Sequence, residues 1–555
     1  MATIDMSIML IAMPDIFRGI HIDPLAPSNS FYFLWMILGF MVVTSVLVVT
    51  LGRLGDMYGR VKMYNLGFAV YTFFSLLLTA TWMSGKAAAI WLVIMRIFQG
   101  VGSAMLMANS TAILTDAFPE NERGMAIGIN QIAGISGSFI GLILGGLLAP
   151  IQWRLIFLVS VPVGLFGTIW AYLKLKEVPR RQHAKLDWAG NATFALGLVG
   201  IMVGITYGIQ PYGHHSMGWD SPRVLASLGL GVILLIAFAI IEYRVDEPMF
   251  NLSLFKIRAF SSGSLSTLLA SMGRGGLMFM MIIWLQGIWL PIHGFDFSRT
   301  PLWAGIYMLP LTLGFLIAGP ISGYLSDRYG ARPFATGGML VAALSFFLLE
   351  LIPVDFSYWQ FGGILLLNGL SMGVFAAPNR AGVMNSLPAQ HRGVGSGMNS
   401  TFQNSAQVLS IGVFFSLMIL GLSASLPQDL FQGLVAHGVS VAAARHASHL
   451  PAVSTLFAAF LGYSPVLHLL PHGVLAHLTK AQLSAIGGRK FFPNLISKPF
   501  SSGLDVAFNF SVVACLVAAG ASWMRGGKYH FQDSTEALDQ YEGLKRLAQS
   551  QTRGS

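Results

Sequence analysis

Long apolar stretches follow one another along almost the whole chain, and short polar segments separate them. A helix needs about 20 apolar residues to cross a bilayer. Stretches of that kind lie near 32–51, 63–83, 90–113, 124–149, 155–175, 189–209, 223–243, 261–289, 302–322, 334–354, 359–382, 394–420 and 507–524. A shorter one covers Met1 to Phe17 and lacks the basic start and cleavage site of a secretory signal. Because it is short and Asp5 lies almost at its start, we expect the true N-terminus upstream of Met1. The pattern predicts an all-α membrane protein with 14 transmembrane helices.

A charged, glycine-rich phrase occurs twice, each time between two apolar stretches. The first copy reads Gly52-Arg53-Leu54-Gly55-Asp56-Met57-Tyr58-Gly59-Arg60, and the second reads Gly323-Tyr324-Leu325-Ser326-Asp327-Arg328-Tyr329-Gly330. This placement predicts a tight loop between two membrane helices, repeated in two halves of one fold. Internal repeats of this kind are typical of secondary transporters.

The composition supports lipid as the main solvent of this chain. Of its 555 residues, 54% are hydrophobic and only 10% are charged, whereas soluble domains carry about 25% charged residues. The mean hydropathy is +0.66. The single cysteine, Cys515, excludes a disulfide framework. No polar stretch is long enough for a soluble enzymatic domain beside a membrane anchor, so we expect no enzyme.

The basic residues indicate which loops face the cytoplasm. The net charge of +10 suggests nucleic acid or a cytoplasmic membrane face, and the positions of the charges favour the second. Lys174, Lys176, Arg180, Arg181 and Lys185 gather near the loop at 176–188, whereas the loop near 210–222 holds no basic residue. By the positive-inside rule the basic loops are cytoplasmic. We therefore expect a multi-pass protein of the plasma (inner) membrane with both termini cytoplasmic, and the long loop 421–506 outside.

The expected outer loop contains six histidines, which raises the question of a metal site. Pro471 breaks the helical spacing between His468 and His472, and no cysteine or nearby carboxylate joins them. We expect plain polar positions rather than a metal site. No phosphate-binding G-x-x-x-x-G-K-[ST] motif occurs, which argues against ATP as the energy source. No cofactor is expected.

Several segments together resemble the major facilitator superfamily, in particular its fourteen-helix drug:proton antiporter branch of the EmrB/QacA type. The first loop phrase resembles the signature G-x-L-x-D-R-x-G-R of that superfamily. The agreement continues in order along the chain, through Ile4-Asp5-Met6-Ser7, Arg96-Ile97-Phe98-Gln99-Gly100-Val101-Gly102, Trp153-Arg154-Leu155-Ile156-Phe157 and Pro378-Asn379-Arg380. The resemblance covers about residues 1–420 and resumes in the last helix.

Three features depart from the pattern of that branch. The glycine face of the fifth helix comprises Gly134, Gly137, Gly141, Gly145 and Gly146, but Leu142 stands where the antiporter motif has proline. Leu142 removes the kink that proline imposes, which weakens the inference of export, while the glycines keep close helix packing possible. Met57 replaces the usual arginine of the loop phrase, and the first helix is short.

The resemblance implies proton coupling through Asp5 and Arg96. Charged groups within a membrane cost roughly 2.5–3.5 kcal/mol each and are rarely without a function. A coupling carboxylate has to load and lose a proton near neutral pH, and burial favours its neutral form. The alternative for Arg96 is that it lies near the outer start of its helix and extends to the lipid headgroups.

The loop phrases suggest a conformational latch. Asp56 lies beside Arg53 and Arg60, and its carboxylate is expected to pair with basic residues or a helix N-terminus of the other half in one state only. Gly52, Gly55 and Gly59 allow the close backbone approach. The second copy repeats the arrangement with Gly323, Asp327, Arg328 and Gly330. A solvated interfacial charge is the alternative for Asp56.

A third charged position, Arg274, is flanked by apolar residues inside the stretch 261–289. At mid-depth it has to face a cavity or a partner, which fits neutral or anionic amphiphiles better than a dedicated organic-cation pump. Gln99 belongs to the same candidate cavity. Trp35, Trp284 and Gln286 are further candidates, with lipid-facing or helix-packing positions as the alternative.

Together these observations predict two six-helix bundles, 1–175 and 250–524, joined by an inserted helix pair within 176–249 and followed by a cytoplasmic tail, 525–555. The predicted function is proton-coupled export of hydrophobic or amphiphilic small molecules by alternating access. A lipid transporter of the same fold and a transport-inactive receptor or scaffold remain alternatives. We expect a monomer whose partners are small-molecule substrate, protons and the bilayer, without nucleic acid.

Overall fold

The computed structural model describes residues 1–23, 26, 29–118, 120–177, 187–213, 215, 217–245, 248, 250–387, 392–462, 466, 470 and 472–526. This part of the chain is helical throughout and contains no β-strand; its one β-bridge joins Tyr212 and His215. The all-α prediction is therefore confirmed for the described residues.

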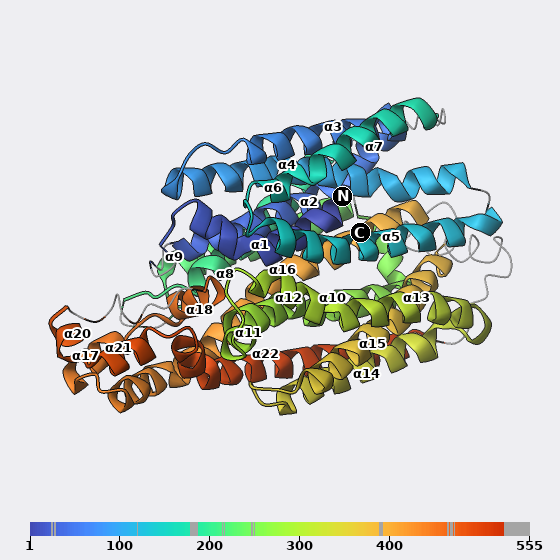
Figure 1. The fold of residues 1–555 in the computed structure, drawn as a ribbon. Helices are drawn as coiled ribbons and strands as arrows, with labels where there is room; N and C mark the ends of the chain where they lie inside the picture. The colour runs from blue at the N-terminus through green and yellow to red at the C-terminus, as the bar shows by residue number, and fades with distance from the viewer. Residues whose placement is uncertain are drawn as a thin grey trace.

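The helices form two bundles with a pair between them in sequence (Figure 1). The first bundle contains α1 (Ala2–Gly19), α2 (Ser30–Tyr58), α3 (Arg60–Thr79), α4 (Gly85–Ala117), α5 (Glu120–Leu148), α6 (Leu155–Leu158) and α7 (Ser160–Lys174). The pair consists of α8 (Trp188–Gly208) and α9 (Pro222–Arg244).

The second bundle follows a short 3-10 turn, η2 (Leu252–Lys256). It contains α10 (Arg258–Trp284), the π-helical turn η3 (Leu285–Trp289), α11 (Leu290–Ile292), α12 (Thr300–Tyr307), α13 (Leu309–Tyr329), α14 (Ala331–Leu351), α15 (Tyr358–Asn385), α16 (Arg392–Ala436) and α22 (Phe491–Trp523). In its described residues, the segment between α16 and α22 contains the short helices α17 (Val441–Ala447), α18 (Ala452–Phe460), α20 (His472–His477) and α21 (Lys480–Ile486).

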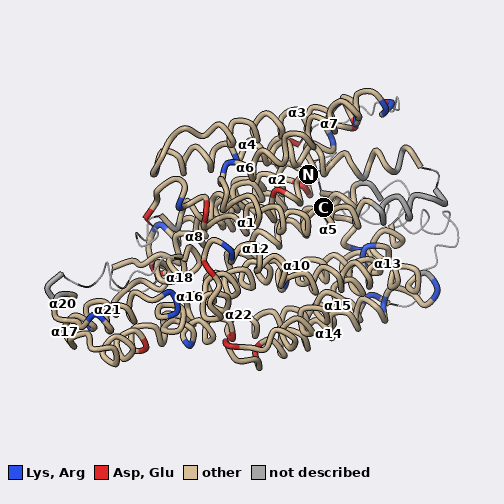
Figure 2. Tube along the Cα trace, in the orientation of Figure 1, with Lys and Arg blue, Asp and Glu red and all other residues tan. Residues whose placement is uncertain are grey.

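Within the described residues, 12 helices are long and apolar enough to cross a membrane. They do not include α1, whose 18 residues carry Asp5, Asp15 and Arg18, or α5, of which Ile132–Leu148 counts as a shorter apolar helix. Figure 2 shows that charged residues are sparse along the helices. A multi-span helical membrane protein is thus established, while the count of 14 spans stays a prediction.

The two loop phrases adopt the same local structure in the two bundles. Gly59, with φ 113°, ends α2 and starts α3, and Gly330, with φ 88°, does the same between α13 and α14. Residues that carry a Cβ rarely adopt such positive φ values, so glycine permits the turn. A Cβ on Gly52 would lie 3.5 Å from the Cβ of Ala108, and one on Gly323 would lie 3.7 Å from that of Ala377. The sequence repeat is therefore a structural repeat.

The inserted pair packs unequally against the bundles. Helix α8 contacts both α2 and α16: the hydroxyl of Thr50 donates to the Asn191 side chain, and Ile205 packs at Gly412. Helix α9 packs mainly on α8. The insertion thus adds one helix along the seam between the bundles and one peripheral helix.

The segment 421–506, expected as a loop, is a loop only in its middle part. Helix α16 continues to Ala436 and α22 begins at Phe491. The extensions are stabilised by apolar residues at every fourth position, which lie on one face of a helix and are buried here: Leu422, Leu426, Leu430 and Leu434 on α16, and Phe492, Ile496, Phe500 and Leu504 on α22. The polar residues between them and Pro427 concealed this spacing in the sequence.

The short helices after α16 extend beyond one end of the bundles (Figure 1). Helix α18 folds back: Phe457 and Phe460 have ring centroids 4.3 and 5.5 Å from that of Phe33 on α2, and Phe457 stacks on Phe415 of α16 at 5.2 Å. All nine residues of α18 are buried. We call this end of the molecule the α18 end, and the opposite one, with the two glycine turns, the Gly59 end.

The fold predicts that the segments before and after α8 lie on opposite sides of the membrane. Helix α8 has 21 residues, which span about 31 Å at about 1.5 Å per residue. Lys176 and Tyr212 are exposed, and Cys515 is buried. We expect an impermeant maleimide to label Tyr212→Cys in intact cells and Lys176→Cys only after permeabilisation. Labelling of both variants in intact cells would contradict this topology.

Candidate functional site

A buried ion pair joins two helices of the first bundle. The Asp5 carboxylate on α1 accepts from the Arg96 guanidinium on α4, and their side chains are 2% and 1% exposed. Two isolated charges would be costly in a membrane interior, but pairing offsets much of that cost. The two residues that the family resemblance selected therefore lie together. Their role in proton coupling stays a prediction.

Further polar groups surround the pair. Arg96 also donates to the Gln99 side-chain oxygen at 2.6 Å and to the Met36 carbonyl at 3.2 Å, and its guanidinium lies 4.3 Å from the centre of the Phe40 ring. Gln99 donates in turn to the Ser75 hydroxyl at 2.8 Å. The guanidinium thus has neutral acceptors and an aromatic face in addition to the carboxylate.

The depth of Arg96 excludes the alternative that its side chain extends to the headgroups. It lies eleven residues after Gly85, the start of α4, which corresponds to about 17 Å along the helix axis. Its side chain is buried and bonded within the bundle. We place the centre of the candidate site at this network.

Two members of the network were missed in the sequence. Ser75 and Tyr71 lie on α3, and the Tyr71 hydroxyl lies close to the Asp5 carboxylate and the Ser160 hydroxyl. A serine and a tyrosine in an apolar stretch give no signal of their own. Only the packing of α1, α3, α4 and α7 brings these groups together.

The first loop phrase forms its ion pair within its own half. Arg60 Nε donates to Asp56 Oδ1 at 2.7 Å. The Glu177 carboxylate, after α7, accepts from the backbone N–H groups of Val61 and Lys62 at 3.4 and 3.2 Å and so caps α3. This arrangement joins α2, α3 and the segment after α7. A latch from Asp56 to the other half stays a prediction for a different conformation. In the second phrase, the Asp327 side chain lies outside the described part of the structure.

The glycine face of α5 permits close packing at four of its five positions. Gly137, Gly141 and Gly145 pack on α1, and a Cβ at Gly145 would lie 3.1 Å from the Cα of Ile8. Gly146 packs on the backbone of Leu302 in α12. Gly134 has no neighbour within 4 Å of a built Cβ. The face thus holds α5 to α1 and to the second bundle, and Leu142 is buried beside Gly305.

The remaining cavity candidates have different positions. Trp284 is buried among Phe356, Phe361 and other rings of the second bundle, which favours the helix-packing alternative for this residue. Gln286 donates to the Ile11 carbonyl at 3.3 Å and links η3 to α1. Trp35 is partly buried, with its ring 5.7 Å from that of Phe31.

Arg274 differs from these residues because its side chain is exposed although it lies in the middle of a membrane span. Its guanidinium lies 5.1 Å from the centre of the Phe315 ring on α13. It makes no hydrogen bond or ion pair with any residue that the structure describes. Exposure without a described partner at this depth is what we expect of an arginine that lines a cavity.

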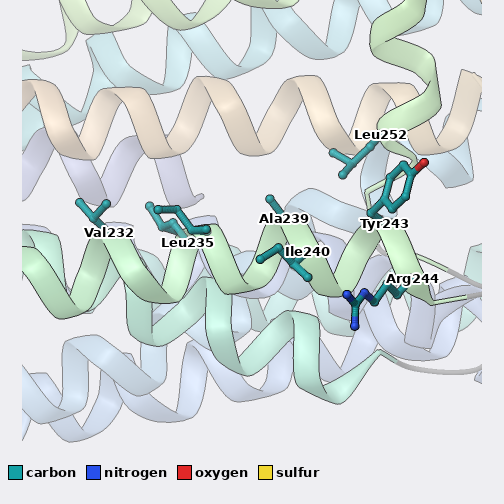
Figure 3. A pocket seen from close by; sticks show the side chains of 8 residues that line it. Val232, Leu235, Ala239, Ile240, Tyr243, Arg244 and Leu252 are labelled. Atoms are coloured by element: carbon teal, nitrogen blue, oxygen red, sulfur yellow. The ribbon is translucent and has the colours of Figure 1, made fainter.

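An open groove lies away from this site. It has a volume of about 750 Å³ on the outer face of α9 (Figure 3) and is lined by Val232, Leu235, Ile236, Ala239, Ile240, Tyr243, Arg244 and Leu252. An apolar groove on a peripheral span, with a tyrosine and an arginine at one end, is typical of a surface in contact with lipid. We assign it no transport role. Among the described residues, no group of three or more potential metal ligands occurs.

Two repeated bundles, with a buried charge pair in the first and an exposed arginine within a span of the second, fit a membrane transporter. The model of the Major Facilitator Superfamily matches residues 1–411. The chain belongs to this family, and it is a multi-pass membrane transporter and not an enzyme.

Several curated relatives are named for resistance to toxic compounds, which is consistent with the drug-efflux branch. The tetracenomycin C resistance and export protein of Streptomyces glaucescens is 28% identical over 94% of this chain and 88% of its own. The methyl viologen resistance protein SmvA of Salmonella typhimurium is 30% identical over 71% of this chain and 76% of its own. The riboflavin transporter RibZ of Clostridioides difficile is 28% identical over 76% of this chain and 86% of its own length. An inward-facing bacterial homologue of the lysosomal transporter Spinster shares the fold, with a TM-score of 0.50 at 14% identity over 94% of this chain and 93% of its own.

The glycine face offers a direct test of its role in packing. In Gly141→Ala the new Cβ would lie against the Ile4 carbonyl and 3.0 Å from the Ser7 Cβ, so α1 and α5 have to separate. Overpacking of this kind costs about 1–3 kcal/mol. We expect a lower thermal unfolding temperature in detergent. The matched control is Gly134→Ala, where nothing lies within 4 Å and helix propensity favours alanine by about 1 kcal/mol. Equal stability of the two variants would contradict the assignment.

Proposed function

We propose that this protein is a proton-coupled exporter of hydrophobic or amphiphilic small molecules. The observation that carries the proposal is the buried Asp5–Arg96 pair, because it places a titratable group inside the membrane where a coupling site is needed. Relatives named for resistance to tetracenomycin C and methyl viologen support toxic small molecules as substrates. The energy source is the proton gradient, without a bound cofactor.

The proposal includes 14 spans in the plasma membrane. Helices α1 and α5 complete the 12 apolar spans because they pack on each other along the glycine face and place Asp5 against α4. With an even number of spans, both termini lie on one side. The basic loops make that side the cytoplasm, at the Gly59 end.

The exchange of contacts at Arg96 provides a route for coupling. While the guanidinium contacts Asp5, the two opposite charges stabilise each other. When α1 and α4 shift apart, Arg96 keeps the Met36 carbonyl, the Gln99 side chain and the Phe40 ring as partners. Asp5 is then free to take up a proton and become neutral. Proton binding and helix movement are thereby linked in one step.

The contacts between the bundles support alternating access. Gln286 bonds to Ile11, Phe33 packs on Phe279 with centroids 5.8 Å apart, and Gly146 packs on Leu302. Arg274 lies twelve residues before Gln286, toward the Gly59 end, and is exposed. We infer a conformation closed toward the α18 end and open toward the Gly59 end, which rocking of the bundles would invert.

The Asp5→Asn variant tests the coupling. Asparagine has nearly the shape of the protonated carboxylic acid but cannot titrate, so the proton cycle is interrupted while the substrate site keeps its form. We expect uphill efflux from proteoliposomes to be lost and exchange of labelled for unlabelled substrate to persist. Uphill efflux at the wild-type rate, at equal protein content, would refute the role of Asp5. Wild-type efflux that survives collapse of the proton gradient would refute proton drive itself.

The Arg96→Ala variant is expected to behave differently. It leaves the Asp5 carboxylate buried without its cation, and breaking a buried pair costs about 3–5 kcal/mol. We expect lower thermal stability and weaker coupling. The double variant Asp5→Asn/Arg96→Ala should recover part of the lost stability. No recovery would show that the two side chains do not act as a pair.

A further inference from the structure

We propose that the cavity binds anionic amphiphiles and that Arg274 pairs with the carboxylate of the substrate. This inference rests on the proposed transport function and adds the charge and class of the cargo: a monoanionic carboxylate with an aromatic or other apolar body. Its basis is the position of Arg274, the ring beside it and the distribution of charge in the second bundle.

The neighbours of α10 show which way Arg274 points. The residues on either side of it face the interior of the bundle: Gly273 lies at Ser511 and Cys515 of α22, and Gly275 lies at Gln407 and Ser410 of α16. Arg274 projects between these directions and reaches Phe315 on α13. Helix α15 packs on both α10 and α13. The guanidinium therefore extends from α10 to α13, and α13 also contacts α5 of the first bundle.

A second arginine lies on the same surface, nearer to the Gly59 end. Arg380 is partly buried on α15, and it has no hydrogen bond or ion pair with the residues that the structure describes. It follows Gly373 by seven residues, about two helical turns, so it lies on the face that packs on α13 at Ala318. Its neighbour Asn379 fixes the register by donating to Thr267 of α10 at 2.8 Å. Arg274 and Arg380 thus follow one another along this surface toward the Gly59 end.

The acidic side chains of this bundle that the structure describes lie elsewhere. Glu350 lies near the end of α14 and accepts from Asn509 at 3.0 Å, and Asp505 lies close to it. The other described carboxylates of the second bundle lie toward the α18 end: Asp296, Asp355 and Asp429. The described surface between α10, α13 and α15 therefore carries positive charge without a carboxylate of its own.

The chemistry of this surface favours a carboxylate over a cation. A guanidinium presents parallel N–H donors that match the two oxygens of a carboxylate. The Phe315 ring beside it offers an apolar contact for the body of the same molecule. An organic cation would meet two unpaired positive charges along this surface.

Binding of two matched fluorescent ligands tests the proposal. Dansylglycine is a carboxylate, and dansylglycinamide is its neutral counterpart of nearly equal size. Binding is measured by dansyl fluorescence with the purified full chain in nanodiscs, without a proton gradient. We expect the wild type to bind the carboxylate about ten- to hundredfold more tightly than the amide, the range for a hydrogen bond to a charged group. Equal or weaker binding of the carboxylate would overturn the proposal.

Variants assign this selectivity to Arg274. In Arg274→Gln we expect the ratio of the two affinities to fall to about one while the affinity for the amide is unchanged. Arg299→Gln, at an exposed position before α12, is the matched control and should keep the wild-type ratio. An Arg274→Gln variant that keeps the ratio would overturn the proposal. If that variant fails to bind the amide, the affinity ratio of Arg274→Lys is measured instead. A preference of this variant for the carboxylate supports the proposal, and the absence of this preference overturns it.

The outcome is separable from that of the coupling experiments. Uphill efflux by Asp5→Asn would refute proton coupling through Asp5 but would leave the affinity ratio untouched. A wild-type protein that prefers tetraphenylphosphonium to dansylglycine would refute the anionic cargo without bearing on the proton cycle.

Discussion

Lipid gives helices no hydrophobic reason to associate, and this constraint governs the structure. Helices in a membrane are held by close packing and by a few polar contacts. Both occur at α1: glycines of α5 admit its backbone, and Asp5 pairs with Arg96 of α4. Close glycine packing holds α1 from Thr3 to Ile11, while the ion pair is a single contact that depends on a protonation state. A helix held in this way is suited to respond to a proton.

The two bundles share a repeat but divide the chemistry between them. The loop turns at Gly59 and Gly330 and the packing of Gly52 and Gly323 are equivalent. The buried charge pair belongs to the first bundle, and the second holds the exposed Arg274, which has no ion-pair partner among the described residues. We interpret this asymmetry as a separation of proton and substrate sites across the moving interface. Coupling between them then passes through the relative position of the bundles.

The additional segments of this chain lie around this interface. Helix α8 covers the seam of α2 and α16, and α18 places Phe457 and Phe460 against Phe33. Both therefore contact elements that have to move if the bundles rock. The peripheral groove on α9 has no such position, which is why its volume does not indicate the transport site.

The sequence by itself determined the helical membrane class, the repeat and the family, because these depend on local hydropathy and on glycine turns. It also selected Asp5 and Arg96 through the family resemblance. Only the tertiary structure decided that these two side chains pair, that Ser75 and Tyr71 join them, and that Trp284 is buried in the second bundle. It also showed that α16 and α22 extend into the expected loop, since the leucines and phenylalanines that stabilise them require a partner helix. Spacing along one chain predicts which face of a helix is apolar, but the identity of the group it meets depends on helices distant in sequence.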